Sequence, residues 1–146
     1  MPYHYGADSA SKLITCDQRL VNVMYEVIKY IDVKVIWGWR GKDQQNGYYD
    51  TGFSQKRWPD SKHNFRRVVD SVLVPNSLAV DIAPYYPDRP HIRWNDSDGF
   101  IYLAGMVMGI AYSMGITLRN GNDWDLDNDL LDQTFYDRGH FELVED

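Results

Sequence analysis

The chain has 146 residues and a mass of 17.1 kDa, which suits one domain with a single core. With 44% hydrophobic and 25% charged residues and a formal charge of -6, it is typical of a globular protein and unsuited to binding nucleic acid. The single cysteine excludes an intramolecular disulfide. We therefore expect one domain over residues 1–146, monomeric and without a nucleic-acid partner.

The first predicted element is an amphipathic helix over residues 16–31. Apolar residues recur there at helical spacing, and Thr15 with Gln18 resembles a capping box. The preceding MPYHYGADSA has neither the basic nor the apolar region of a secretory signal, and we expect it to be a loosely held arm.

Two strands are predicted in the middle of the chain. VKVIWGW, residues 33–39, is β-branched and aromatic, and the following GKDQQNGYYDTGF is expected to hold a short helix broken by Gly47 and Gly52. SLAVDIAP, residues 77–84, alternates apolar residues with small or acidic ones, so Asp81 emerges from the middle of a strand.

The uncharged run of residues 100–118 leaves two interpretations open, a core helix or a membrane span. Its tyrosines and glycines and the acidic loop after it favour a core helix capped by Asp96 or Asp98, without stable membrane insertion. TLR, residues 117–119, and FELV, residues 141–144, predict short strands. These elements predict an α+β fold, with a small and mostly antiparallel sheet backed by helices.

Three short segments supply the residues of an open zinc site. SKH contributes His63, AVD contributes Asp81 and DRGH contributes His140. Two imidazoles and a carboxylate are the protein ligands of a catalytic Zn²⁺ whose fourth position holds water. Such a site needs a further carboxylate as general base and then acid. Asp137 is placed for that role, or else it is an ordinary turn residue before a glycine.

The acidic stretch DWDLDND, residues 123–129, begins like a calcium loop. Asn128 and Thr134 stand where an EF-hand requires glycine and glutamate, which excludes that motif and leaves an irregular calcium site or a solvated loop. Trp124 within it is either a wall of a substrate cleft or a core anchor.

The segments GWRGKDQQ, RWPDSKHN, SLAVDIAPYYP, WND, GNDWD and YDRGHFEL occur in this order. They resemble the zinc D,D-carboxypeptidases and dipeptidases of the VanX and VanY type, most closely the bacteriophage endolysins that cut between L-alanine and D-glutamate. The resemblance implies a hedgehog/D,D-peptidase-like fold and a zinc peptidase that acts on the peptide stems of peptidoglycan. A D,D-carboxypeptidase acting on D-Ala-D-Ala termini is the alternative, and a non-catalytic wall- or membrane-associated protein is a third interpretation.

The resemblance also implies a role for each motif residue. His63, Asp81 and His140 would bind one Zn²⁺ per chain. Asp137 would be the catalytic base, and Arg40 would steady the scissile carbonyl and its developing oxyanion, unless it is an ordinary surface or salt-bridged arginine.

Two further polar residues lie close to the candidate ligands in the sequence. Ser61 and Glu142 are candidates for orienting the ligand imidazoles, or else polar residues of an exposed strand face.

A lysis enzyme without a signal peptide would be made in the host cytoplasm and would reach the cell wall only after another protein permeabilises the membrane.

The chain departs from the family pattern between the first histidine and the aspartate, where NFRRVVDSVLVPNSLAV intervenes. Asp70 copies the short family spacing but lacks the AVDIAP context. We choose Asp81, because a strand fixes the direction of a ligand side chain, whereas a change in loop length costs little free energy. The inserted VVDSVLV is expected to form a flap or hairpin over the cleft.

Alanine variants of the two aspartates test this choice. We expect Asp81→Ala to lose bound zinc and activity, whereas Asp70→Ala keeps both, as measured by metal analysis and cell-wall hydrolysis. The opposite pattern would assign the ligand to Asp70.

Overall fold

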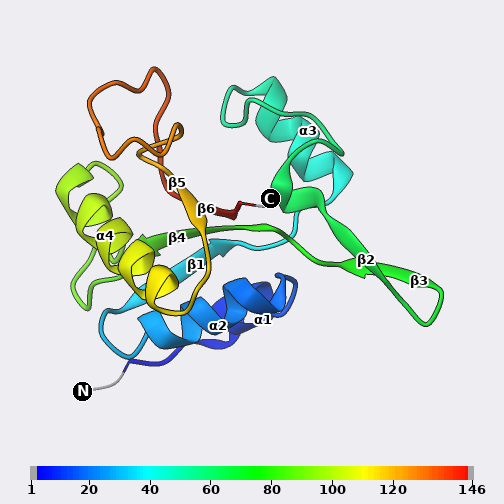
Figure 1. The fold of residues 1–146 in the computed structure, drawn as a ribbon, viewed down its shortest axis with the longest axis horizontal. Coiled ribbons are helices and arrows are strands. Elements are labelled where there is room, and N and C mark those ends of the chain that lie inside the picture. The colour runs from blue at the N-terminus through cyan, green and yellow to red at the C-terminus, as the bar shows by residue number, and fades with distance from the viewer. Residues whose placement is uncertain (1–2, 145–146) are drawn as a thin grey trace.

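The computed structural model describes residues 3–144, and a four-stranded antiparallel sheet lies at its centre (Figure 1). The strand order is β1-β4-β6-β5. The strands are β1 (Val33–Trp37), β4 (Ala79–Pro84), β5 (Leu118–Gly121) and β6 (Asp137–Leu143). Because β4 and β6 occupy the middle, side chains from both can meet on either face.

Helices cover one face of this sheet. α2 (Gln18–Val27) and α4 (Ser97–Ser113) contact each other, α4 packs on β4, β5 and β6, and α1 (Ala7–Leu13) packs against β1. In Figure 1, α1 and α2 lie below the sheet, whereas α3 (Lys42–Asp50) and the loop of residues 122–136 lie above it. This arrangement confirms the predicted α+β fold with a small antiparallel sheet backed by helices.

Alternation along the two central strands separates the core from the polar face. Val80 and Ile82 of β4 and Phe141 and Leu143 of β6 are at most 1% exposed and belong to the core cluster. The residues between them project from the other face of the sheet. The predicted alternation in SLAVDIAP and FELV is therefore confirmed, although β6 begins earlier than predicted, at Asp137.

The N-terminal arm is a prediction that the structure corrects. Residues 1–2 lie outside the described part of the chain, but α1 forms where a loose arm was expected. Ser9 is 2% exposed, and its hydroxyl accepts a hydrogen bond from the backbone N–H of Val35 at 3.1 Å. This bond connects α1 to β1, so this part of the N-terminal segment is held against the sheet and is not a loose arm.

The predicted helix over residues 16–31 is also corrected, because α2 is shorter at both ends. Asp17 caps the helix by accepting from the backbone N–H of Arg19 at 3.0 Å. Thr15, the predicted cap, instead donates to the carbonyl of Lys12 and accepts from the backbone N–H of Trp39. Thr15 therefore joins α1 to the segment after β1.

The apolar run forms the core helix α4. Asp96 caps it by accepting from the backbone N–H of Gly99 at 3.1 Å, which decides between the two predicted caps. Beyond its end, Gly115 has a φ of +72°, a conformation that ends helices and favours glycine. Among the described residues, no helix combines the length and apolar character that crossing a membrane requires.

α3 differs from its prediction at one glycine. The helix continues through Gly47, so the break predicted there is wrong. It ends before Gly52, whose φ of +83° lies in the left-handed region.

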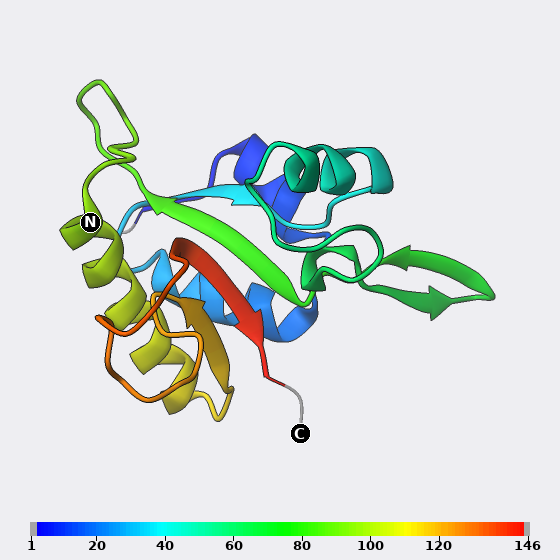
Figure 2. The ribbon, with the colours of Figure 1, turned by 90° about the horizontal axis from the view of Figure 1, so that it is seen from above.

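The segment inserted between His63 and Asp81 forms a hairpin of β2 (Arg66–Val69) and β3 (Val72–Pro75). It projects from the body of the molecule in both ribbon views (Figures 1 and 2). The predicted hairpin is therefore confirmed. Its residues do not line the hollow beside His63 and His140, so its predicted place over the cleft is not confirmed.

The base of this hairpin explains how the insertion is tolerated. The backbone N–H of Asn76 donates to the carbonyl of Phe65 at 2.9 Å, and that of Leu78 donates to the carbonyl of Lys62 at 3.0 Å. The chain thus returns to the place where it left, and the insertion adds length without moving the flanking segments.

Truncation in the core should destabilise the fold far more than truncation on the hairpin. For Phe141→Ala, with a fully buried ring, we expect a loss of about 3–5 kcal/mol in the free energy of unfolding, measured by urea denaturation. Val68→Ala is the control, since Val68 is 67% exposed and should change stability by no more than about 0.5 kcal/mol. Equal losses would contradict this account of the core.

Candidate active site

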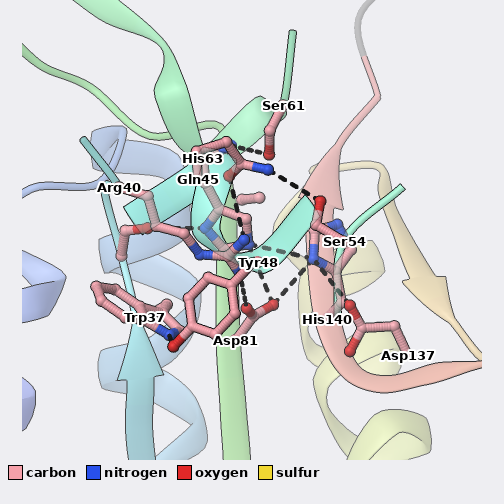
Figure 3. Close-up of polar contacts among 12 residues, drawn as sticks. Trp37, Arg40, Gln45, Tyr48, Ser54, Ser61, His63, Asp81, Asp137 and His140 are labelled. Atoms are coloured by element: carbon pink, nitrogen blue, oxygen red, sulfur yellow. Dashed lines mark hydrogen bonds and ion pairs between the residues drawn. The ribbon is translucent and has the colours of Figure 1, made fainter. Parts of the chain in front are cut away.

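Three side chains from separate elements converge on the polar face of the sheet (Figure 3). His63 lies in η1 (Lys62–Asn64), and Asp81 in β4 pairs directly with His140 in β6. His63 Nε2 lies 3.3 Å from His140 Nδ1 and 3.2 Å from Asp81 Oδ1. His140 Nδ1 and Asp81 Oδ1 are 2.9 Å apart. The three atoms form a nearly equilateral triangle, an arrangement that can hold a metal ion.

The ring of His63 is held in one orientation by the backbone. Its Nδ1 lies 2.7 Å from the carbonyl oxygen of Gly38, which can only accept, so Nδ1 carries the proton and Nε2 presents its lone pair to the cluster. The hydroxyl of Ser61 accepts from the backbone N–H of His63 and caps η1. Burial lowers the pKa of His63, which favours the neutral ring that a metal ion requires.

His140 lies between two carboxylates. Its Nε2 is 2.8 Å from Glu142 Oε1, and its Nδ1 faces Asp81. Burial opposes a charged ring, but the hydrogen bonds with Asp81 and Glu142 outweigh it and raise the pKa of His140 to about 10. The contact with Glu142 holds Nε2 and leaves Nδ1 facing Asp81 and His63, the position from which it could bind a cation.

Asp81 is oriented by a buried arginine. Arg40 Nη2 lies 2.6 Å from Asp81 Oδ2, and this leaves Oδ1 for the two histidines. Arg40 is 7% exposed, and its guanidinium lies over the rings of Trp37 and Tyr48. Burial opposes ionisation of Asp81, but the two neighbouring histidines hold its pKa well below the usual value.

Asp137 stands at the edge of the cluster, at the start of β6. Its Oδ2 lies 3.9 Å from His140 Nδ1. Burial, followed by the charge of Asp81, raises the pKa of Asp137 to about 6. A carboxyl group titrating near neutral pH is suited to both accepting and returning a proton.

A hollow of about 480 Å³ opens beside these groups. Arg40, His63, Asp137 and His140 line it, as does Trp124, whose ring centroid lies 5.4 Å from that of His140. Trp124 is thus a wall of the cleft, the first of its two predicted interpretations.

The structure brings together all five residues that the sequence singled out as ligands or catalytic groups. It also places Glu142 against the imidazole of His140, only 7% exposed rather than on a solvated strand face. Ser61 contacts the backbone N–H of His63 and not its ring. Asp70 lies elsewhere, in the turn of the β2–β3 hairpin.

Sequence reasoning missed Gln45, which is fully buried in α3. Its Oε1 accepts from Arg40 Nη1 at 3.2 Å and from Asn64 Nδ2 at 3.3 Å, and its Nε2 donates to Ser54 and to the backbone. The only signal was its place in GWRGKDQQ, five residues after Arg40 on a predicted helix.

The acidic loop forms a second, exposed cluster. Asp123, Asp125 and Asp127 each offer an oxygen within 4.8 Å of the others. The carboxylate of Asp123 already accepts from the backbone N–H groups of Asp127 and Asn128. The irregular calcium site and the solvated loop both stay predictions.

The antiparallel sheet carries a cluster of two histidines and an aspartate beside an open hollow, and this cluster is able to bind a metal ion. Residues 1–144 match the sequence model of the family described as phage L-alanyl-D-glutamate peptidase. The chain belongs to this family, which confirms the resemblance inferred from its motifs.

Two individual proteins illustrate the relationship. The L-alanyl-D-glutamate peptidase of Escherichia phage T5 is 29% identical over 150 residues, which cover 99% of this chain and all of that protein. The crystal structure of the L-Ala D-Glu endopeptidase ChiX from Serratia marcescens superposes with a TM-score of 0.73 at 23% identity. The match covers 98% of this chain and 91% of ChiX, and it shows a shared fold.

Glu142→Gln tests whether the carboxylate behind His140 tunes the metal site. The variant keeps the size of the side chain but removes its charge, and we expect affinity for added Zn²⁺ to fall about 10- to 100-fold in chelator competition. Glu26→Gln is the matched control, because Glu26 lies on α2 and its carboxylate is paired with Lys29. This variant should leave zinc affinity unchanged. If Glu142→Gln and the wild type bound zinc with equal affinity, Glu142 would have no role in tuning the metal site.

Proposed function

We propose that the chain is a zinc-dependent endopeptidase that hydrolyses the L-alanyl-D-glutamate bond in the peptide stems of peptidoglycan, as a phage-type endolysin. Family membership and the activity named for the T5 relative support the reaction. The observation that carries the proposal is the triangle of His63, Asp81 and His140, with Asp137 at its edge.

The geometry of the triangle supports zinc as the metal ion. Tetrahedral zinc has bonds of about 2.0–2.2 Å to histidine nitrogen and carboxylate oxygen, which places two ligand atoms about 3.3 Å apart. The separations here are 2.9, 3.2 and 3.3 Å. When bound, zinc supplies a Lewis acid that polarises the scissile carbonyl and lowers the pKa of a bound water.

Asp137 is the proton carrier in this proposal. Its carboxylate accepts a proton from the attacking water and then donates it to the nitrogen of the leaving D-glutamate. Its raised pKa matches this double task, because the carboxylate of a stronger acid would be too weak a base to take the proton from the attacking water. Its contact with His140 keeps the carboxylate next to the reacting atoms.

Arg40 has two tasks in the proposal. Its ion pair with Asp81 fixes which carboxylate oxygen faces the histidines. Because Arg40 also lines the hollow, its guanidinium is available to stabilise negative charge on the scissile carbonyl oxygen when substrate approaches. Gln45 holds the guanidinium from behind and limits its reorientation.

The proposed setting follows from the substrate. Peptidoglycan lies outside the cytoplasmic membrane, so we propose that the chain acts, as a monomer, on the cell wall after the membrane has been permeabilised. Its substrate is recognised at the cleft and not by net charge, since both the chain, at -6, and bacterial wall polymers are anionic.

Digestion of purified peptidoglycan tests the proposed function. With zinc-loaded enzyme we expect new D-glutamate amino termini, detected by mass spectrometry, without release of free D-alanine. Asp137→Ala should retain zinc while its rate falls at least about a hundredfold, the scale of a lost general base. Release of free D-alanine alone would instead indicate a D,D-carboxypeptidase, and loss of zinc from Asp137→Ala would make Asp137 a ligand.

A further inference from the structure

Two basic side chains lie together in the hollow beside the metal cluster. Lys62 precedes His63 in η1, and Arg119 lies in β5 at the edge of the sheet. Both line the hollow, with side chains 23% and 35% exposed. They converge on one atom, since Arg119 Nη2 lies 2.7 Å and Lys62 Nζ 3.8 Å from Glu142 Oε2.

The charges at this place do not cancel. Lys62 and Arg119 bring two positive charges against the single carboxylate of Glu142, the one acid paired with them. Lys62 Nζ also donates to the backbone carbonyl of Leu143 at 2.6 Å, and Asp132 and Asp137 line the same hollow without an ion pair to either base. Glu142 also contacts His140 through its other oxygen, so its charge is shared among three partners.

Arg119 keeps hydrogen-bond donors for a ligand. Within residues 3–144, its side chain makes one hydrogen bond, from Nη2 to Glu142. Its Nε is buried without a partner, whereas Nη1 has no partner and belongs to a part-exposed side chain. A guanidinium with a free Nη1 beside a lysine ammonium is suited to binding a carboxylate.

The substrate of the proposed function must present such a group. D-Glutamate has two carboxyl groups, and its nitrogen forms the bond to alanine. At most one carboxyl group continues the peptide stem, so the leaving fragment keeps a free carboxylate close to the scissile bond. We propose that Lys62 and Arg119 form the subsite for this free carboxylate and thereby direct the D-glutamyl side of the substrate into the hollow.

A second hollow, of about 340 Å³, lies on the other side of Asp137 and is suited to the alanyl side. Apolar residues including Ile36, Trp94 and Phe100 line it. Its one basic residue, Arg138, is already engaged, because it donates to the side chain of Asn122 and stacks over the ring of Tyr136. Asp137 lines both hollows and so stands at the junction where the scissile bond would lie.

A pair of peptides tests the subsite, and because it rests on the proposed function both must contain the L-alanyl-D-glutamyl bond. One carries the free glutamyl carboxylate, and its twin carries a carboxamide there. We expect zinc-loaded wild type to prefer the carboxylate peptide by at least about tenfold in kcat/KM, the worth of a charge-assisted contact. In Lys62→Gln and in Arg119→Gln the preference should fall to about threefold or less, with zinc content retained.

Two further variants make the test specific. Arg67→Gln removes one positive charge from the exposed hairpin and should keep the wild-type preference. Arg138→Gln should also keep it, and loss of the preference in that variant alone would move the carboxylate to the other hollow and overturn the assignment.

The remaining outcomes also decide the matter. Equal cleavage of both peptides by the wild type, or an unchanged preference in both Lys62→Gln and Arg119→Gln, would overturn the subsite while leaving the proposed function intact. Cleavage of neither peptide would overturn the proposed function and the subsite with it.

Discussion

The antiparallel register between β4 and β6 is the constraint on which the site depends. It sets Asp81 directly opposite His140, so their side chains meet on the polar face of the sheet. A slip of β6 by one residue would turn His140 toward the core and Phe141 toward the polar face, so that His140 no longer faced Asp81. Apolar packing on the far face supports this register, since Phe141 and Ile82 are buried in the core cluster and α4 packs on both β4 and β6. The hydrophobic core therefore fixes the positions of polar groups that it does not touch.

Electrostatics assigns different tasks to three neighbouring acids. Burial opposes ionisation of Asp81 and Glu142, but His63 and His140 lower the pKa of Asp81, and His140 followed by Arg119 lowers the pKa of Glu142. Asp137 has no lysine or arginine ion pair within residues 3–144, and its pKa rises. In the proposed function, Asp81 is a metal ligand and Glu142 orients the imidazole of His140, whereas Asp137 exchanges the proton.

The inserted hairpin accounts for the long segment between His63 and Asp81. β2 and β3 leave the body of the protein and return to the same place, so most of the seventeen residues between His63 and Asp81 lie in an excursion that closes at its base. Closing a longer loop costs little free energy, whereas changing the direction of a strand would move a ligand to the other face. Asp81 lies beside His63 and His140, whereas Asp70 lies in the turn of the hairpin, and the assignment of Asp81 as the ligand stays a prediction.

The sequence by itself determined the elements that a local period encodes. Alternation in SLAVDIAP and FELV separated core residues from Asp81 and His140, and the order of motifs identified the family. Only the tertiary structure showed that α1 is a helix held against β1. It also showed that Gln45 supports Arg40, and that Lys62 and Arg119 converge on Glu142. Strand alternation follows from backbone geometry within a few residues. These contacts join side chains from separate elements, and their partners are fixed only when the elements pack together.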